Sequence, residues 1–351
     1  MSSSLTRKSR RPRIEPGRSL RILIVKLSSL GDVVHTMPVV HDILAAHPGA
    51  VIDWVVEPGF APLLRRVDGI GSVIECALRR WSKAWWTAPV RAEWRAFRAR
   101  LQQNHYDAVI DLQGLTKSAV IARLARGTSY GLANQTDGAS HEWPARWLVD
   151  HAISVPQRIH AMDRARVLVG AALHYQPEGP PRYGLRATPA MRRGGAAGAP
   201  MVVFVHGTSR DDKLWPQSNW VQLGKRFLAA GWSIALPQGN ESEQTRAELI
   251  AAAWQFEQVM RVEVWPSVSL DAVVDRLAAT QGVIGVDSGL SHIAVALNLP
   301  HVQLYNFPTA WRTGPQAEHG HRHQVSVEGQ SIPSLEAVWA AWLQVAEAAR
   351  E

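Results

Sequence analysis

Short apolar runs alternate with amphipathic segments along most of the chain. Each run ends at a small or polar residue, which is typical of a buried parallel strand followed by a turn. The segments between the runs repeat apolar residues every three or four positions, as helices packed on a sheet do. This alternation predicts doubly wound parallel sheets in an α/β fold. The predicted strands cover residues 21–26, 51–56, 72–77, 106–112, 201–206, 232–237, 282–287 and 301–305.

The helical pattern predicts a long helix over residues 33–46, further helices over 242–254 and 289–297, and one that opens near residue 218. The last helix begins at Ser334, a typical N-cap residue. Its apolar residues recur at helical spacing, so it packs on a neighbour, and the N-terminal half of the chain is one option. This apolar face consists of Leu335, Val338, Trp339, Trp342 and Leu343.

A stretch rich in Pro, Gly, Arg and Ala interrupts the alternation at residues 178–200 and has the composition of a linker. The strand–helix pattern restarts after it. We therefore predict two Rossmann-like domains, an N-terminal one over residues 19–180 and a C-terminal one over residues 198–351. Two such domains face a central cleft, and ligands bind there at the carboxyl ends of the strands.

Composition excludes several classes of protein. With 351 residues, of which 46% are hydrophobic, the chain has ample material for two cores and is not a disordered polymer. The single cysteine, Cys76, excludes a disulfide framework and a cysteine-based zinc cluster. No apolar run approaches the roughly 18 to 20 residues of a membrane span, and the N-terminus lacks the apolar core of a signal peptide. We therefore expect a cytoplasmic protein.

Basic charge gathers in two segments. Residues 1–18 carry +5 of the net charge of +8, and we predict that they form a disordered tail. Residues 79–100 carry a net charge of +6 and include interleaved tryptophans. This second segment is either an amphipathic helix packed through Trp94, Phe97 and Leu101, or a surface that suits a lipid–water interface and phosphorylated sugars.

Several motifs of nucleotide and metal chemistry are absent. The sequence contains no G-x-G-x-x-G, no G-x-x-x-x-G-K and no H-E-x-x-H. A standard dinucleotide dehydrogenase, a P-loop kinase and a zincin are therefore disfavoured. Since no cluster of carboxylates suggests a Mg²⁺ site either, we expect neither a metal nor a cofactor.

The first loop that could carry chemistry follows the first predicted strand, at residues 26–35. Ser28 and Ser29 offer hydroxyl and backbone N–H groups to an anion or a sugar hydroxyl at a helix N-terminus. Lys26 either neutralises a phosphate or extends from the core to solvent. Asp32 is either a helix N-cap or a general base in the cleft.

Two further loops follow strands of the C-terminal half. Residues 206–216 bring Thr208, Ser209 and Lys213 to a strand end, where hydroxyl groups and a cation can hold phosphate, although a polar surface loop would look the same. In the other loop, a strand runs straight into small residues that open a helix, a place that favours a diphosphate. The residues of that loop are Asp287, Ser288, Gly289 and His292.

Five segments together carry a family resemblance. They are Ile24–His35, Arg79–Trp85, Tyr106–Leu115, Ser209–Pro216 and Val286–His292. In these segments and in their order, the chain resembles the bacterial lipopolysaccharide heptosyltransferases, inverting glycosyltransferases with the two-Rossmann GT-B fold. The resemblance runs from about residue 20 to the end. Segments 79–85 and 209–216 favour the members that add the first heptose of the inner core.

The resemblance implies a donor, ADP-L-glycero-β-D-manno-heptose, and an acceptor, the Kdo of Kdo2-lipid A. It implies that Asp32 is the catalytic base, that Glu243 lies at the donor ribose and that Val268 lies beside the adenine. The donor diphosphate and sugar would be held by Thr208, Ser209, Lys213, Asp287, Ser288, Gly289 and His292. The acceptor would be bound by Lys26, Ser28, Ser29, Arg79, Arg80 and Lys83. The chain departs from the family at Tyr305–Thr309, which reads Tyr-Asn-Phe-Pro-Thr where relatives usually have Tyr-Gly-Pro-Thr, so Asn306 and Phe307 are the differing residues.

With this function, the expected protein is a monomer at the cytoplasmic face of the inner membrane, without a nucleic-acid partner. Three alternatives stay open. One is a later heptosyltransferase that uses a heptosylated core acceptor, and another is a sugar-nucleotide epimerase of similar architecture. The third is a binding module that grips nucleic acid through the tail and the tryptophan-rich segment, although no nucleic-acid-binding module is recognisable.

Overall fold

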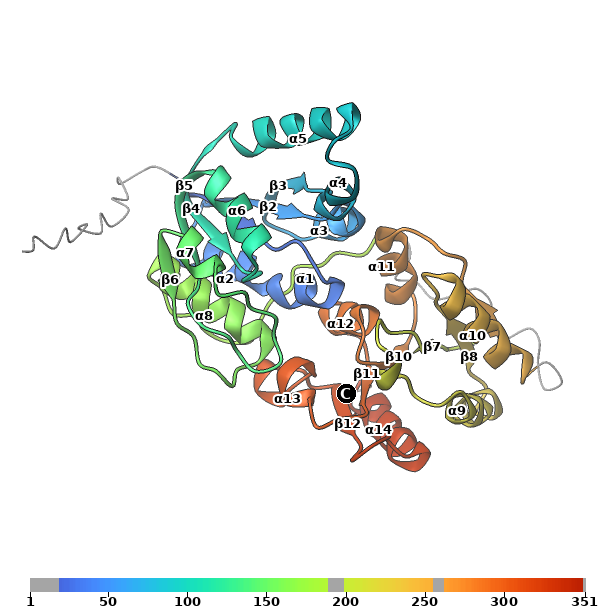
Figure 1. The fold of residues 1–351 in the computed structure, drawn as a ribbon. Helices are drawn as coiled ribbons and strands as arrows, with labels where there is room; N and C mark the ends of the chain where they lie inside the picture. The colour runs from blue at the N-terminus through green and yellow to red at the C-terminus, as the bar shows by residue number, and fades with distance from the viewer. Residues whose placement is uncertain (1–18, 189–198, 255–261, 350–351) are drawn as a thin grey trace, which may run out of the picture.

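Two parallel sheets, one in each half of the chain, build the protein (Figure 1). The computed structural model describes residues 19–188, 199–254 and 262–349. The predicted basic tail at residues 1–18 lies outside the described residues. Both sheets are covered by helices, so the predicted α/β fold with two Rossmann-like halves is confirmed.

The N-terminal sheet has six strands in the order β3-β2-β1-β4-β5-β6. Its strands are β1 (Arg21–Val25), β2 (Val51–Val56), β3 (Ile70–Glu75), β4 (His105–Asp111), β5 (Arg126–Leu132) and β6 (His151–Ile153). Its helices are α1 (Leu30–Thr36), α2 (Pro38–Ala46), α3 (Ala61–Leu64), α4 (Leu78–Ala84), α5 (Ala88–Leu101), α6 (Thr116–Leu124), α7 (Ala145–Leu148) and α8 (Ala161–Leu173).

The C-terminal sheet repeats this topology, in the order β12-β11-β10-β7-β8-β9. Its strands are β7 (Met201–Val205), β8 (Ser233–Leu236), β9 (Val262–Val264), β10 (Gly282–Val286), β11 (His301–Tyr305) and β12 (Gln324–Glu328). Its helices are α9 (Gln217–Ala229), α10 (Glu241–Ala252), α11 (Leu270–Ala278), α12 (Gly289–Ala296), α13 (Ala310–Thr313) and α14 (Leu335–Ala348).

In each sheet the strand order reverses beside the first strand. The loops after β1 and β4, and those after β7 and β10, therefore leave the sheets on either side of a topological switch point. Crevices outside the carboxyl ends of strands at such points are where open α/β sheets bind ligands. All the loops singled out in the sequence start at these points.

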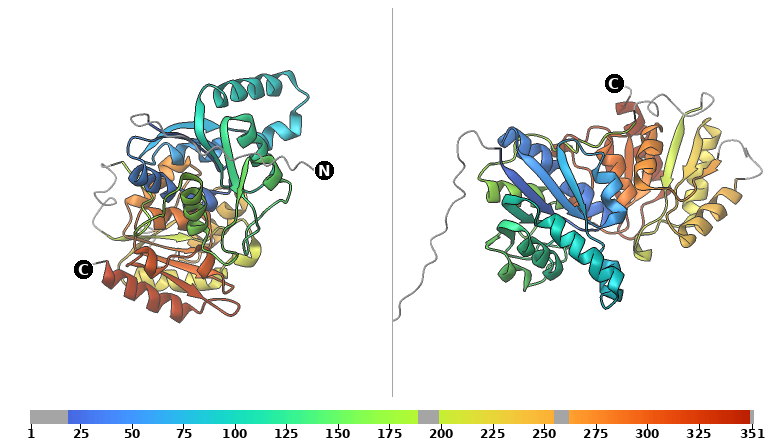
Figure 2. Two further views of the ribbon diagram at one scale, coloured as in Figure 1. Left: turned by 90° about the vertical axis from the view of Figure 1, so that its left-hand side faces the viewer. Right: turned by 90° about the horizontal axis from the view of Figure 1, so that it is seen from above.

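The two halves meet along α1 and α12, which pack against each other in the middle of the molecule (Figures 1 and 2). A Cβ atom at Gly289 would lie 2.6 Å from the Leu30 side chain, so glycine permits the close crossing. Buried apolar side chains of both halves join in one cluster around this contact. At one edge, the Arg66 guanidinium of the N-terminal half makes two 2.7 Å hydrogen bonds to the Asp275 carboxylate on α11.

Some predicted elements differ from the observed ones. Pro38 begins a second helix, so the predicted helix over 33–46 is two helices. Strands β5, β6, β9 and β12 were not predicted, because their sequences lack a clean apolar run. The last helix packs on β11, β12 and α9 of its own half through Val338 and Trp342, and not on the N-terminal half. Leu343 does not belong to the packed face, since 52% of it is exposed.

Candidate active site

The two switch points face each other across a cavity of about 410 Å³. One wall comes from the loops after β1, β4 and β5 and from the start of α8. The opposite wall comes from the loops after β7 and β10 together with α12 and α13. The structure thereby brings together most of the residues predicted for chemistry. These are Lys26, Ser28, Ser29, Asp32, Ser209, Lys213, Asp287, Ser288, Gly289 and His292.

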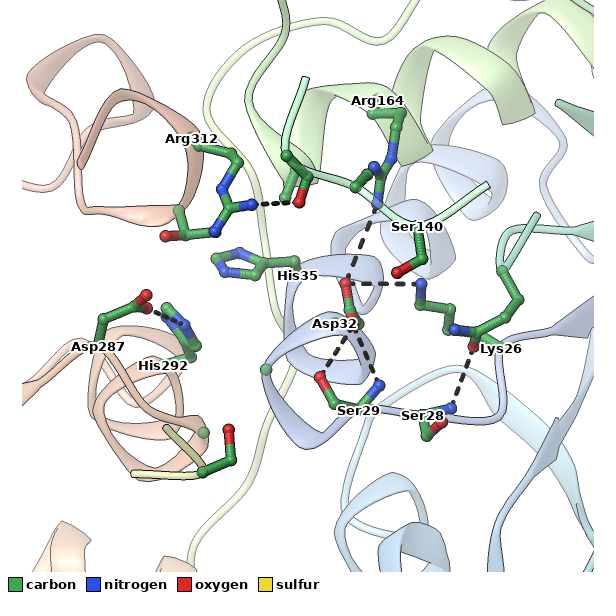
Figure 3. A pocket seen from close by; sticks show the side chains of 18 of the residues that line it. Lys26, Ser28, Ser29, Asp32, His35, Ser140, Arg164, Asp287, His292 and Arg312 are labelled. Atoms are coloured by element: carbon green, nitrogen blue, oxygen red, sulfur yellow. Dashed lines mark hydrogen bonds and ion pairs between the residues drawn. The ribbon is translucent and has the colours of Figure 1, made fainter. Parts of the chain in front are cut away.

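Asp32 lies in the first turn of α1, at the centre of this cavity (Figure 3). One carboxylate oxygen accepts hydrogen bonds from the backbone N–H of Ser29, at 3.1 Å, and from its hydroxyl, at 2.9 Å. The other oxygen lies 3.7 Å from the Lys26 amine and 4.0 Å from the Arg164 guanidinium. Ser29 is the N-cap of α1, so the interpretation of Asp32 as the N-cap is wrong.

The surroundings of Asp32 favour its ionised form. Burial alone would raise the pKa of Asp32, but Lys26, the two hydrogen bonds from Ser29 and the charge of Arg164 outweigh it and lower the pKa. The side chain keeps 37% of its surface exposed. Asp32 is therefore a carboxylate at neutral pH with an open side, which is what a proton acceptor requires.

A second layer of residues holds the loop that carries Ser28 and Ser29. The Gln113 side-chain oxygen accepts from the backbone N–H groups of Leu27 and Ser28, both at 3.1 Å. Asp111, at the end of β4, in turn accepts from the Gln113 backbone N–H at 2.9 Å. Burial raises the pKa of Asp111 to about 6, against these hydrogen bonds. The sequence motif at 106–115 contained Gln113, but nothing in it indicated which loop the amide would hold.

Asp287 lies on the opposite wall of the cavity, at the end of β10. One oxygen lies 2.6 Å from the Lys213 amine, and the other lies 3.3 Å from the His292 ring nitrogen Nε2. Burial would raise the pKa of Asp287, but His292 and Lys213 lower it. Ser288 is the N-cap of α12. The first-turn N–H groups of such a helix favour an anion in front of them.

A second cavity of about 340 Å³ adjoins the first and has a more apolar wall. Ser29, Gly31, Ser209, Ser288 and Gly289 line both cavities, so the two are continuous. The predicted donor residues Thr208, Glu243 and Val268 line this second cavity, together with Gln238 and Pro237.

Hydrogen bonds fix two of these donor-side residues. One Glu243 oxygen accepts from the backbone N–H of Gly239 at 2.8 Å, and the Thr208 hydroxyl donates to the Asp287 carbonyl oxygen at 3.0 Å. Asn306, where the chain departs from the family pattern, donates through its side-chain amide to the carbonyl oxygens of Asp212 and Leu214, both at 2.9 Å. Its side chain therefore stabilises the loop that carries Lys213.

The other predicted acceptor residues, Arg79, Arg80 and Lys83, lie on α4, exposed, and line neither cavity. Arg80 forms an ion pair with Glu93, which also accepts a 2.8 Å hydrogen bond from the Trp81 ring.

The tryptophans of residues 79–100 divide between core and surface. Trp81 and Trp94 pack on Phe97, so they belong to the core. Trp85 and Trp86 are exposed. The amphipathic packing predicted for this segment is therefore confirmed at Trp94 and Phe97, whereas a role of the exposed residues at a lipid surface stays a prediction.

The cavity residues that were not predicted from the sequence include His35, Gln113, Arg164 and Arg312. Arg164 lies on α8 and Arg312 on α13, far along the chain from the recognisable loops. No local pattern marks them, because only the folded arrangement of the two halves brings them to Asp32.

A histidine–aspartate group crosses between the two halves near this site. His319 contacts the Asp163 carboxylate at 2.9 Å, and His160 contacts the Gly314 carbonyl at 3.2 Å. His160, Asp163 and His319 lie close enough together to share a metal ion. Each of them is used here in contacts that hold α8 against the C-terminal half. The expectation that the chemistry needs no metal stays a prediction.

Comparison with known proteins decides the family. The sequence pattern of glycosyltransferase family 9 (heptosyltransferase) matches residues 94–337. Lipopolysaccharide heptosyltransferase 1 of Escherichia coli strain K12 is 40% identical over 288 residues, which cover 82% of this chain and 88% of the relative. The chain belongs to glycosyltransferase family 9, the heptosyltransferases. The predictions of a glycosyltransferase and of heptose transfer in lipopolysaccharide core synthesis are confirmed by this relationship.

Solved structures of family members agree with the fold. The E. coli heptosyltransferase WaaC with ADP superimposes with a TM-score of 0.80 at 35% identity, covering 94% of this heptosyltransferase and 100% of WaaC. WaaC with ADP-2-deoxy-2-fluoro heptose gives a TM-score of 0.75 at 36% identity, covering 92% and 98% of the two chains. The predicted GT-B arrangement is therefore confirmed.

Proposed function

We propose that this heptosyltransferase transfers L-glycero-D-manno-heptose from ADP-L-glycero-β-D-manno-heptose to the Kdo of Kdo2-lipid A. The observation that carries the proposal is the pair of continuous cavities, with Asp32 facing one of them and Glu243 and Val268 lining the other. The similarity to WaaC, whose solved complexes contain ADP and a fluorinated ADP-heptose, supports this donor.

The donor spans both cavities in this proposal. Its adenosine occupies the cavity of about 340 Å³, with the adenine beside Val268 and the ribose at Glu243. Its diphosphate lies where the cavities join, in front of Ser288 and Gly289 at the start of α12 and beside Ser209. Helix N–H groups and hydroxyl donors suit a diphosphate there.

The heptose then lies in the larger cavity, next to Asp32. The Asp32 carboxylate takes the proton of the acceptor hydroxyl as the hydroxyl oxygen attacks the anomeric carbon, on the face opposite ADP. The bond between the anomeric carbon and the diphosphate oxygen breaks, and ADP leaves with the electron pair. The start of α12 and the Lys213 amine stabilise the charge that develops on ADP. The product has the inverted configuration at the anomeric carbon.

We also propose that the enzyme works at the surface of the inner membrane, because its acceptor is a glycolipid. None of the helices in the described ranges is long and apolar enough to cross a bilayer. Trp85, Trp86, Trp143 and Trp147 expose between 56% and 70% of their surface, and tryptophan favours the lipid–water interface. The Arg146 guanidinium packs over the Trp143 ring, which places a positive charge beside one of these exposed aromatic side chains.

The test of the function is ADP release from ADP-heptose, with and without purified Kdo2-lipid A. The proposal predicts release only when the acceptor is present, with heptose found on Kdo by mass spectrometry. Release with a heptosylated core but not with Kdo2-lipid A would instead assign the later transfer step. Conversion of the sugar nucleotide without any acceptor would indicate an epimerase.

The membrane proposal has its own measurement. Sedimentation with vesicles of phosphatidylglycerol and phosphatidylethanolamine should capture the wild-type protein, and Trp85→Ser/Trp86→Ser should weaken capture several-fold. Equal capture of both proteins would contradict a role for these side chains. The control is Leu249→Ser on α10, because the Leu249 side chain is exposed. A Trp232→Ser variant would not serve, because Trp232 packs on Phe227.

A further inference from the structure

An arginine of the C-terminal half reaches across the domain contact into the acceptor side of the cavity. Arg312, on α13, donates through its guanidinium to the carbonyl oxygen of Gly138, in a loop of the N-terminal half. Gly138 has φ +68°, and a Cβ atom there would overlap the Arg312 side chain. Only glycine lets the guanidinium lie against this loop.

The positive charge of Arg312 has no carboxylate partner among the described residues. Its guanidinium donates to a neutral carbonyl group, and its Nε is buried without a hydrogen-bond acceptor. By contrast, two other cations of this cavity have carboxylate partners. Lys213 pairs with Asp287 on the wall of the C-terminal half, and Lys26 lies near Asp32 on the opposite wall. Arg312 is therefore a cation of this cavity that is free to bind a ligand anion.

A second arginine faces the same space from the N-terminal half. Arg164, on α8, donates to the Thr136 hydroxyl at 2.9 Å, and its guanidinium lies 4.0 Å from the Asp32 oxygen that also faces Lys26. Its side chain is 11% exposed. Burial lowers the pKa of Arg164, Asp32 opposes this, and the charge of Arg312 lowers it further, as two neighbouring cations do. Figure 3 shows both side chains directed toward the space above Asp32.

A buried histidine also borders this space. His35 is 5% exposed, lines the cavity and has no hydrogen-bond partner at either ring nitrogen within the described part of the chain. Burial lowers its pKa well below the ordinary value, so the ring is neutral and can donate one hydrogen bond and accept another. The cavity therefore offers two cations, one from each half, and a polar ring without a hydrogen-bond partner around one space.

The donor diphosphate does not account for these groups. The cavity assigned to adenosine includes neither Arg164 nor Arg312, and the two cavities join at Ser209, Ser288 and Gly289. A diphosphate at that junction lies beside Lys213. The two arginines border the remaining part of the larger cavity, next to Asp32, where the acceptor hydroxyl must be.

We propose that Arg312 and Arg164, one from each half, form a binding subsite for the carboxylate of the acceptor sugar acid, with His35 bordering it. This proposal rests on the proposed function, in which the acceptor is Kdo, a sugar that carries a carboxylate. Arginine suits a carboxylate because its planar donors can make two parallel hydrogen bonds. A subsite shared by the two halves is complete only when they are together, so acceptor binding and domain closure favour each other.

The test compares Arg312→Gln, Arg312→Lys and the wild type, with Arg158→Ala as the matched control. Arg158 also crosses to α13, stacking 4.1 Å over the Trp311 ring, but it does not line the cavity. Arg312→Gln should raise the KM for Kdo2-lipid A about 10- to 100-fold, the effect of losing a hydrogen-bonded charge, with Arg312→Lys in between. The dissociation constant for ADP-heptose should change less than about twofold in all the variants.

A direct titration separates this subsite from the function as a whole. The α-methyl glycoside of Kdo should bind the ADP-loaded wild type more tightly than Arg312→Gln, while its carboxyl methyl ester should bind both equally. If the wild type transfers no heptose to Kdo2-lipid A, the proposed function fails, and the titration still tests the subsite. An unchanged KM and titration in Arg312→Gln, or an equal loss in Arg158→Ala, would overturn the proposal.

Discussion

The two halves of this heptosyltransferase each bring an aspartate to the shared cavity, Asp32 in the helix after β1 and Asp287 at the end of β10, and use it differently. Asp287 is 7% exposed, and its two oxygens are held by Lys213 and His292. Asp32 is 37% exposed, and its second oxygen has cations at 3.7 and 4.0 Å rather than in hydrogen-bond contact. The fold brings both carboxylates to the cavity. Their neighbours decide whether a carboxylate holds the surrounding loops together, as Asp287 does, or can accept a proton, as Asp32 can.

A substitution at Asp32 should have the largest effect on the rate of heptose transfer. Asp32→Asn keeps the shape of the side chain but removes the proton acceptor, so kcat should fall about 10²- to 10⁴-fold. The melting temperature and the ADP-heptose dissociation constant should stay near those of the wild type, because one side of Asp32 is open. A folded Asp32→Asn protein with near-normal kcat would contradict the role of base.

The equivalent change on the other side should act on stability and donor binding. Asp287→Asn leaves the Lys213 amine beside a neutral partner, which should cost about 2 to 3 kcal/mol of unfolding free energy. ADP-heptose binding should weaken as well, and urea unfolding and donor titration measure the two effects. Asp212→Asn, at an exposed ion pair with Arg210, is the control and should change little. Equal stability of the two variants would contradict the fastening role.

The buried histidines of the C-terminal half should make the free energy of unfolding depend on pH. Burial lowers the pKa of His206 and of His301 to about 4, from an ordinary value of 6.5. Since the fold disfavours their protonated forms, their contribution is complete above pH 6.5 and is lost as the pH falls toward 4. Each contributes a loss of about 1.4 kcal/mol per pH unit in that window.

Chemical denaturation between pH 7.5 and 4.5 measures this slope. His301→Gln should reduce this slope, because one buried histidine no longer takes up a proton on unfolding, and His323→Gln, at a partly exposed position, serves as the control. An unaltered slope in His301→Gln would show that other groups cause the acid destabilisation.

The smallest expected effect concerns the basic helix α4, outside the cavities. Arg79→Glu should raise the KM for Kdo2-lipid A about fivefold, because one basic group near an anionic lipid surface contributes about 1 kcal/mol. Donor affinity should not change. Arg226→Glu, at an exposed pair with Glu336 in the C-terminal half, serves as the control. Unchanged acceptor kinetics in Arg79→Glu would make this arginine a surface residue without a role in binding.

The sequence predicted the fold and the loops of the site because both depend on local pattern. Apolar runs mark β1, β4, β7 and β10, and the polar residues that follow them necessarily gather at the switch points. Strand β5, with its sequence Arg-Gly-Thr-Ser-Tyr-Gly-Leu, offered no apolar run, although its second half is buried. It owes its place to pairing with β4, a contact between distant residues.

The same reason explains the missed site residues. Arg164 lies on a helix that carries a second arginine, and Arg312 lies in a four-residue helix outside the loops that the sequence singled out. Their place beside Asp32 depends on how α8 and α13 meet across the two halves. The roles of Glu243 and Val268 came from the family resemblance alone, and the structure places both in the second cavity.

The most direct test of the account is a crystal structure of this enzyme with ADP-2-deoxy-2-fluoro heptose. The account predicts the adenine beside Val268, the diphosphate in front of Ser288 and Gly289, and the anomeric carbon facing Asp32 with room for one hydroxyl group between them. A heptose directed away from Asp32, or a diphosphate bound at Arg164 and Arg312, would contradict both the assignment of the base and the division of the cavities between donor and acceptor.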